Sequence, residues 1–246
     1  MSRTKSFRFT IAVLRDFWYV SMMPTLDYSS AEGDRYHAGR HKEFFDNPLL
    51  ARAMADFVRI TYFAALKPGQ SVLEIGSGLG TNLLSIKDTA SVTAVEPSKL
   101  ARDHSNSQGI KTLASLTELP PGATFDFILL RHVIEHLPEP QKMLLNVRPL
   151  LAPGGTLIVA LPIEPATAPP DPGDIDHHLY SWTRQTISNL LRESGYAQVS
   201  TRLNYRNGRK LLMPVYKMCG AKMYVRSLQC LGRLRGLSEI VAEAKI

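Results

Sequence analysis

The chain has 246 residues, of which 44% are apolar and 21% are charged, with 16 glycines, 16 prolines and a formal net charge of +7. This length fits one globular domain with a short appendage, and the composition excludes collagen, a disulfide-rich scaffold and a disordered polyelectrolyte. The two cysteines, Cys219 and Cys230, have no metal-ligand spacing, and we interpret them as buried or free thiols of a reducing compartment.

The first 45 residues are aromatic and basic and have no clear period over most of their length, so we interpret residues 1–45 as a cap segment on a domain that spans residues 46–246. The apolar stretch from Phe9 to Leu14 is interrupted by Arg15 and Asp16. It therefore falls short of the roughly 20 apolar residues that span a bilayer. No signal-peptide pattern follows it, and we expect a cytoplasmic protein without a transmembrane segment.

A regular alternation of elements begins after the cap segment. Apolar residues recur at helical intervals from Asn47 to Leu66, and a Lys-Pro-Gly break follows. Short apolar runs then predict strands, and helical patterns lie between them. Such alternation predicts a parallel, doubly wound sheet with right-handed crossovers. The strands are expected at Ser71–Ile75, Ser91–Val95, Phe125–Leu130 and Thr156–Leu161, and the helices at Leu79–Lys87, Ser98–His104 and Gln141–Leu151.

A proline-rich stretch, Pro162 to Pro172, ends this alternation. A helix is expected over Thr183–Glu193, a strand near Gln198–Leu203 and a last strand near Ile240–Lys245. We expect residues 206–237 to form a helical insertion before that last strand.

Positive charge is concentrated near the C-terminus, where ten basic residues follow Ser200 against two acidic residues, Glu239 and Glu243. This region is either a solvated basic face or a surface for an anionic acceptor or acidic carrier. Lys217, Lys222 and Arg226 would share one side of a helix. No nucleic-acid motif accompanies the charge, so nucleic acid is not an expected partner.

A glycine-rich turn joins the first predicted strand to the segment that follows. Glycine at positions 76, 78 and 80 permits positive φ angles and a close approach of a ligand to the main chain. At the end of the second strand stands Glu96, which is suited to accept hydrogen bonds from both hydroxyls of a ribose. Thr81 stands where a dinucleotide-binding GxGxxG motif would place its last glycine, so the turn favours a ligand without a pyrophosphate.

Four stretches together carry a resemblance to a known family: Leu-Glu-Ile-Gly-Ser-Gly-Leu-Gly at 73–80, Val-Glu-Pro-Ser at 95–98, residues 125–137 with Arg-His-Val-Ile-Glu-His, and Leu-Leu-Ala-Pro-Gly-Gly-Thr-Leu at 150–157. This set resembles the class I S-adenosylmethionine-dependent methyltransferases, in particular the small-molecule branch similar to ubiquinone-biosynthesis methyltransferases. The resemblance implies a Rossmann-like α/β fold. Its seven-stranded, mostly parallel sheet would have the order 3-2-1-4-5-7-6, an antiparallel last strand and helices on both faces.

The resemblance also implies a cofactor, S-adenosyl-L-methionine, and residues that bind it. The glycine turn would line its methionine and ribose, Glu96 would hold the ribose hydroxyls, and a segment of the N-terminal cap would cover it. Ser115 departs from the Asp or Asn that similar proteins place beside the adenine. The implied residues are Glu74, Gly76, Ser77, Gly78, Gly80, Glu96, Pro97, Ser98, Ser115, Leu116, Leu130 and Arg131, with Tyr36 and Arg40 from the cap segment.

Methyl transfer from a sulfonium is an in-line displacement, so the protein mainly aligns the reactants and excludes water. A base is needed when the acceptor arrives as a hydroxyl or an ammonium, and histidine suits that role near neutral pH. We expect the base among His178, His177 and His132, and we interpret His136 as architectural. The histidines show no ligand spacing such as HExxH, so no metal is expected.

The expected reaction is methylation of a small-molecule or carrier-bound acceptor at oxygen or nitrogen. Two alternatives remain open. One is a catalytically silent subunit that binds S-adenosylmethionine for a partner. The other is a nicotinamide-dependent oxidoreductase, which would use a similar glycine turn but would leave the Arg-His-Val-Ile-Glu-His stretch unexplained.

Overall fold

A computed structural model describes residues 27–164, 167, 169, 171 and 174–246 of the chain. The apolar stretch Phe9–Leu14 lies outside the described residues. None of the helices within the described ranges has both the length and the apolar character needed to cross a bilayer. The described cysteines, Cys219 and Cys230, are both free and exposed.

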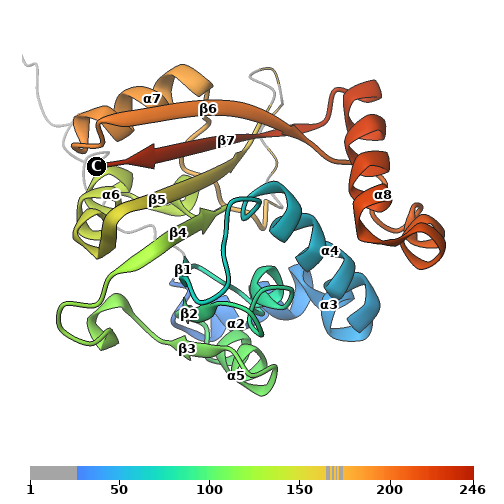
Figure 1. The fold of residues 1–246 in the computed structure, drawn as a ribbon, viewed down its shortest axis with the longest axis horizontal. Coiled ribbons are helices and arrows are strands. Elements are labelled where there is room, and N and C mark those ends of the chain that lie inside the picture. The colour runs from blue at the N-terminus through green and yellow to red at the C-terminus, as the bar shows by residue number, and fades with distance from the viewer. Residues whose placement is uncertain (1–26, 165–166, 168, 170, 172–173) are drawn as a thin grey trace, which may run out of the picture.

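Seven strands form one sheet: β1 (Ser71–Ile75), β2 (Ser91–Val95), β3 (Lys111–Leu113), β4 (Phe125–Arg131), β5 (Leu151–Pro162), β6 (Gln198–Tyr205) and β7 (Ser238–Lys245). Their order is β3-β2-β1-β4-β5-β7-β6 (Figure 1). Strands β1 to β5 pair in parallel, whereas β7 lies antiparallel to both β5 and β6. The predicted strand order and the antiparallel last strand are confirmed.

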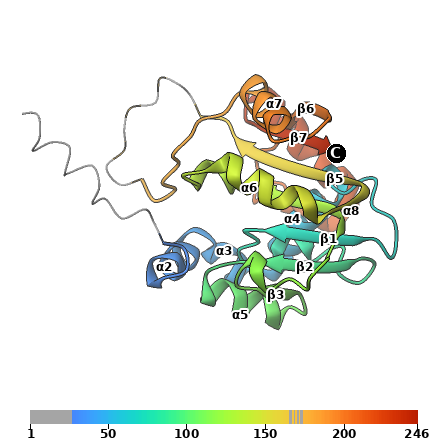
Figure 2. The same ribbon diagram turned by 90° about the vertical axis from the view of Figure 1, so that its left-hand side faces the viewer.

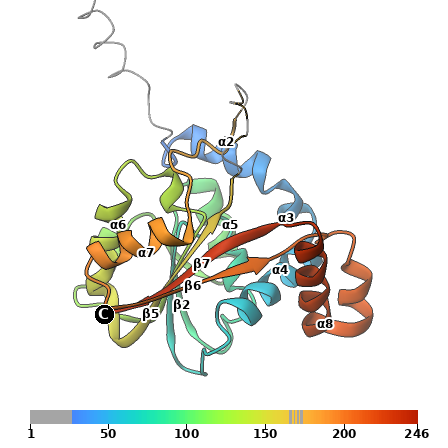
Figure 3. The same ribbon diagram turned by 90° about the horizontal axis from the view of Figure 1, so that it is seen from above.

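Helices cover both faces of this sheet (Figure 3). On one face lie α4 (Pro48–Thr61) and α8 (Met213–Leu234), and on the other lie α6 (Pro140–Val147) and α7 (Arg184–Glu193). The side chain of Asn47 accepts the Leu50 N–H at 3.0 Å, so α4 begins at a capped turn with proline in its first position. Both apolar faces of the sheet are buried, as the continuous apolar strand sequences predict.

The segment after the glycine turn differs from the predicted helix over Leu79–Lys87. It forms only a short 3₁₀ turn, η2 (Thr81–Leu83), followed by further turns. Arg52 of α4 donates to the Leu84 carbonyl at 3.0 Å and so ties these turns to α4. Leu83 and Ile86 are buried three residues apart, a spacing that suits a 3₁₀ turn.

Two helices of the cap segment lie beyond the carboxyl ends of the parallel strands (Figure 2). These are α2 (Ala31–Arg40) and α3 (Lys42–Asp46). Asp34 of α2 accepts the Ser98 hydroxyl at 2.6 Å and the Leu100 N–H at 3.0 Å, and so attaches α2 to the amino end of α5 (Lys99–Ser107). A carboxylate at a helix amino end is favoured by the helix dipole.

The long helix α8 lies between β6 and β7 in the chain, and it is kinked at Gly220, which has φ of 76°. Tyr224 and Leu228 pack in the core, whereas the basic side chains of α8 are exposed. The kink separates Lys217 from Lys222 and Arg226, so the single continuous basic side predicted from the sequence does not form.

The glycine turn generates a stability prediction. Gly80 has φ of +72°, and a Cβ there would lie 2.3 Å from the Ser105 hydroxyl oxygen and 2.9 Å from Ile110 Cδ1. We expect Gly80→Ala to lower the free energy of unfolding by about 2 to 4 kcal/mol, through backbone strain and overpacking. Chemical denaturation measures this change.

Gly122→Ala is the matched control, because Gly122 has a similar φ of +75° but no atom within 4 Å of the added Cβ. This variant should lose about 1 kcal/mol, the backbone cost alone. Equal losses in the two variants would show that Gly80 is not tightly packed.

Candidate functional site

The glycine turn follows β1 at the carboxyl edge of the sheet. Gly76, Gly78 and Gly80 all have positive φ angles, of 69°, 52° and 72°. A Cβ on Gly76 would lie 2.6 Å from Val133 Cγ2, and a Cβ on Gly78 would lie 3.3 Å from the His41 ring. The turn therefore requires glycine for two reasons: its backbone has positive φ angles, and its neighbours leave little space for a Cβ.

The carboxylate of Glu96 holds this turn in place. One oxygen accepts the Gly78 N–H at 2.8 Å, and the other accepts the Ser98 N–H at 2.9 Å. The Nε2 atom of His37, from α2, lies 3.4 Å from the same carboxylate, and Glu96 is only 3% exposed. The predicted acidic residue is thus beside the predicted glycine turn.

A second carboxylate, Glu74, lies under the turn and is fully buried. One of its oxygens accepts the Asn82 amide, and the other has no hydrogen-bond partner among the described residues. Burial raises the pKa of Glu74 to about 8, against the Asn82 hydrogen bond and Arg131, which both lower it. The neighbouring Ser77 hydroxyl is also buried without a partner. Orphaned polar groups of this kind indicate a missing polar ligand.

Helix α2 covers this edge with aromatic side chains. The His37 and His41 rings contact through their Nδ1 atoms at 3.1 Å, and burial is the main cause that lowers the pKa of His41 to about 3. Arg40 donates to Asp176 at 2.9 Å, and Tyr36 packs edge-on against His37. The structure thus brings Tyr36 and Arg40 to the edge where the sequence predicts them.

The other expected cofactor contacts lie along the same edge. Pro97 and Ser98 follow β2, and the Ser98 hydroxyl accepts the Ala101 N–H at 3.2 Å as the cap of α5. Ser115 and Leu116 follow β3, and the Ser115 hydroxyl is bonded to that of Thr117 at 2.6 Å.

The side chain of Arg131 belongs to a separate buried network. Its guanidinium lies 3.3 Å from Glu239 and 3.4 Å from the Tyr62 hydroxyl. Only the backbone of Leu130 and Arg131, at the end of β4, remains for the role expected of these two residues.

Three predicted histidines have different surroundings. His132 has φ of +56°, and its ring bridges Glu239, at 3.1 Å, and Glu135, at 3.5 Å. His177 also has a positive φ, of 50°, but it is exposed. His178 is oriented by Glu164, which contacts its Nδ1 atom, and it packs edge-on against His136 with 4.7 Å between ring centroids.

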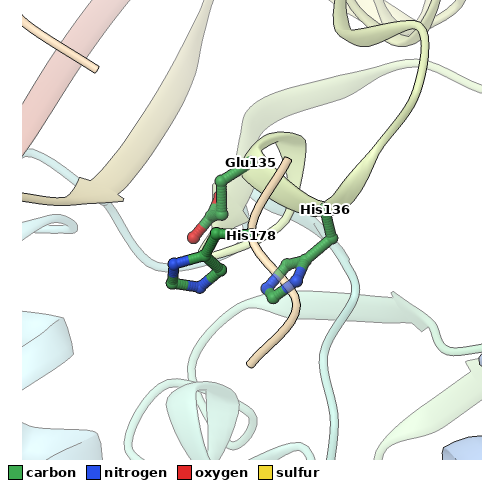
Figure 4. Close-up of side chains that lie close together, drawn as sticks. All are labelled: Glu135, His136 and His178. Carbon is green, nitrogen blue, oxygen red and sulfur yellow. The ribbon is translucent and has the colours of Figure 1, made fainter. Parts of the chain in front are cut away.

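Glu135, His136 and His178 form a compact group, hereafter the Glu135 cluster (Figure 4). Glu135 and His136 lie on the short turn η4 (Ile134–His136), and the Leu179 N–H donates to the Glu135 carbonyl at 2.8 Å, which brings His178 alongside. Sequence reasoning missed the roles of Glu135, Glu164 and Asp34. The adjacent Glu135 and His136 in the sequence were a signal for Glu135, whereas Glu164 and Asp34 had no such signal.

The chemistry of the carboxyl edge distinguishes between ligands. Two buried carboxylates, Glu74 and Glu96, flank the glycine turn. Glu96 would repel a phosphate, and the two carboxyl groups together suit a ligand with an ammonium group and vicinal hydroxyls. The residues present therefore fit the nucleoside and amino-acid parts of a phosphate-free cofactor.

A family model described as a methyltransferase domain matches residues 43–201. Among curated proteins, the ubiquinone biosynthesis O-methyltransferase of Xanthomonas campestris is 34% identical over 118 residues, which cover 42% of this chain and 48% of that protein. The matched part thus spans about half the length of this relative.

Solved methyltransferase structures share the fold. The N-methyltransferase NodS of Bradyrhizobium japonicum, in complex with S-adenosyl-L-homocysteine, has a TM-score of 0.57 at 16% identity, covering 89% of this chain and 98% of that one. The 1,6-didemethyltoxoflavin-N1-methyltransferase of Burkholderia thailandensis has a TM-score of 0.55 at 20% identity, covering 96% and 91%.

Proposed function

Because this chain belongs to the methyltransferase domain family, as a class I member that depends on S-adenosylmethionine, we propose that it transfers a methyl group to oxygen or nitrogen of a small-molecule acceptor, free or carrier-bound. The observation that carries this proposal is the pair of buried carboxylates, Glu74 and Glu96, on either side of the glycine turn. Bound S-adenosylmethionine supplies the methyl group on a sulfonium, and the chain supplies alignment and exclusion of water.

Each part of the carboxyl edge then has a proposed task. Glu96 accepts the two ribose hydroxyls, and Glu74 faces the ammonium group of the methionine part. The methionine part is lined by the glycine turn, that is by Gly76, Ser77, Gly78 and Gly80. The adenine is bordered by Pro97, Ser98, Ser115 and Leu116. The backbone of Leu130 and Arg131 faces the ammonium group. His37 Nε2 lies 3.4 Å from a Glu96 carboxylate oxygen, where the ribose would bind, so α2 has to shift before a ribose reaches that carboxylate.

The acceptor side is proposed to lie over the Glu135 cluster. The loop that carries this cluster packs on the glycine turn through Val133, so it is adjacent to the cofactor position. Among the predicted histidines, His178 is favoured because Glu164 orients its ring, whereas His177 is exposed and His132 is held between two carboxylates. His178 therefore acts at the reacting atom of the acceptor.

Excess positive charge at the end of β4 supports an anionic acceptor. Arg131 and His132 both contact one carboxylate, Glu239, at 3.3 and 3.1 Å, and half-buried Arg206 lies over the Phe57 ring. Several cationic groups around one carboxylate favour an anion nearby. A carboxylate or phosphate on the acceptor would supply it.

The first prediction concerns the ribose contact. We expect Glu96→Ala to weaken binding of S-adenosylhomocysteine by about 1 to 3 kcal/mol, because two hydroxyls lose a charged acceptor. Isothermal calorimetry measures the affinity, with Glu193→Ala, an exposed carboxylate on α7, as the control. Unchanged affinity in Glu96→Ala, or tighter binding of NAD than of S-adenosylhomocysteine by the native chain, would contradict the proposal.

Glu74 makes cofactor binding depend on pH. Its pKa of about 8 means that it is mostly protonated at pH 7 in the free protein. An ammonium group favours the ionised carboxylate, so binding releases a proton. Affinity should rise by up to roughly tenfold per pH unit as the pH approaches 8 from below, and then level off. Glu74→Gln should abolish this slope, and a slope that persists in the variant would assign it elsewhere.

Loss of the His178 ring separates acceptor chemistry from cofactor binding. In His178→Ala we expect at least a tenfold lower turnover of the acceptor that a screen of small hydroxyl and amine compounds identifies, with unchanged S-adenosylhomocysteine affinity. Cofactor-product release measures turnover. Equal rates in variant and native chains would remove His178 from the reaction. A native chain that binds the cofactor but methylates nothing in the screen would be a silent subunit.

A further inference from the structure

The Glu135 cluster contains a buried carboxylate whose ion-pair partner among the described residues is the His132 ring, with Nδ1 3.5 Å from Oε1. Glu135 is fully buried, and neither of its oxygens has a hydrogen-bond partner among the described residues. A buried carboxylate without hydrogen bonds is costly unless it is paired or binds a cation. The mechanism of methyl transfer proposed above gives it no task.

Two imidazoles converge on this carboxylate. One potential ligand atom each from Glu135, His136 and His178 lies within 4.8 Å of the others, and Figure 4 shows both rings beside the carboxylate. Tetrahedral zinc ligands stand about 3.4 Å apart, so rotation of these side chains by about 1 Å would close the group around one ion. Two imidazoles and a carboxylate are a common ligand set for zinc and other first-row metals.

The Nδ1 atom of each imidazole already has a hydrogen-bond partner. His178 Nδ1 contacts the Glu164 carboxylate, and His136 Nδ1 lies 3.1 Å from the Tyr28 hydroxyl. This leaves Nε2 of His178 for a ligand. The His136 ring also has a hydrogen bond with the Asp176 backbone, which a bound ion would replace. Metal-binding histidines usually have their second nitrogen fixed in this way, by a carboxylate or another oxygen.

The charge states also suit a cation. Other acidic groups stand nearby: Glu164 on His178, and Asp176, which together with Glu135 lies close enough to Tyr36 to help raise its pKa. His132, the other basic group at Glu135, is itself held by Glu239.

We propose that Glu135, His136 and His178 bind one divalent transition-metal ion, for which Zn²⁺ is the reference, through a Glu135 oxygen and the Nε2 atoms of both histidines. Three protein ligands leave a tetrahedral ion one open position, as in catalytic rather than structural zinc sites. The site differs from the absence of metal that the sequence predicts, because its ligands come from two segments with no motif spacing.

The ion extends the proposed function, on which this step rests. The Glu135 cluster adjoins the glycine turn, so the open position would take a hydroxyl oxygen of the acceptor and hold it toward the cofactor. The ion would lower the pKa of that hydroxyl, whose proton would pass to solvent, so His178 is not needed as the base. His178 then acts at the acceptor as a metal ligand. This favours an oxygen acceptor over a nitrogen one.

Direct binding of Zn²⁺ tests the site without any acceptor. The full chain, freed of metal by chelator and dialysis, is titrated with Zn²⁺ in a calorimeter, with Mg²⁺ as a second probe. We expect one Zn²⁺ per chain and much weaker Mg²⁺ binding, because Mg²⁺ prefers oxygen ligands. Absorption of bound Co²⁺ in the visible range reports the coordination geometry.

Matched variants locate the ion. Glu135→Gln and His136→Gln should each weaken Zn²⁺ binding by at least about 100-fold, and Glu164→Gln, which only orients His178, by about 10-fold to 100-fold. His104→Gln, whose ring packs on Phe45 outside the cluster, should bind as the native chain does. Circular dichroism checks folding, and should Glu135→Gln fail to fold, His136→Gln and Glu164→Gln carry the test.

The outcomes are distinct. Absence of stoichiometric Zn²⁺ binding, tighter binding of Mg²⁺ than of Zn²⁺, or equal Zn²⁺ affinity in all folded variants would overturn the metal site. S-adenosylhomocysteine affinity is measured on the same samples. Normal cofactor binding without Zn²⁺ binding rejects the metal site alone, whereas Zn²⁺ binding without cofactor binding rejects the proposed function alone.

Discussion

The carboxylate of Glu96 organises the carboxyl edge of the sheet. It accepts backbone N–H groups from Gly78 and Ser98, so it joins the turn after β1 to the amino end of α5. The positive φ of Gly78 is what allows that N–H to point at the carboxylate. Because the same carboxylate faces His37, the cap helix, the glycine turn and the second strand all meet at one side chain.

A second group of contacts lies beyond the end of β4, at the Glu135 cluster, where two histidines have positive φ angles. Among the described residues, His132 and His177 are the two non-glycine residues with positive φ, and each precedes a part of the Glu135 cluster, His132 the Glu135–His136 pair and His177 the adjacent His178. Tyr28 connects the two points, since its hydroxyl contacts His136 and its ring packs on Tyr36 beside His37. The cap segment therefore contacts both the carboxyl edge of the sheet and the Glu135 cluster.

Sequence reasoning predicts the parts of this protein that depend on local pattern. The extents of β1 and β2 follow from continuous apolar runs. The glycine turn and Glu96 follow from closely spaced glycines after one strand and an acidic residue after the next. It fails where a distant side chain decides. Arg52 bonds to the Leu84 carbonyl within the turns that replace the expected helix, and Gly220 kinks α8 although the hydrophobic pattern continues through it. The Glu135 cluster likewise forms because residues 178–179 lie beside Glu135 although they are distant in sequence, and no motif spacing indicates this contact.

The attachment of α2 has a kinetic consequence. Asp34 holds α2 on the amino end of α5, and Arg40 ties it to Asp176 on the opposite loop. In the proposed function, a nucleoside that enters or leaves past His37 displaces α2, so these two fastenings add to the barrier of cofactor exchange.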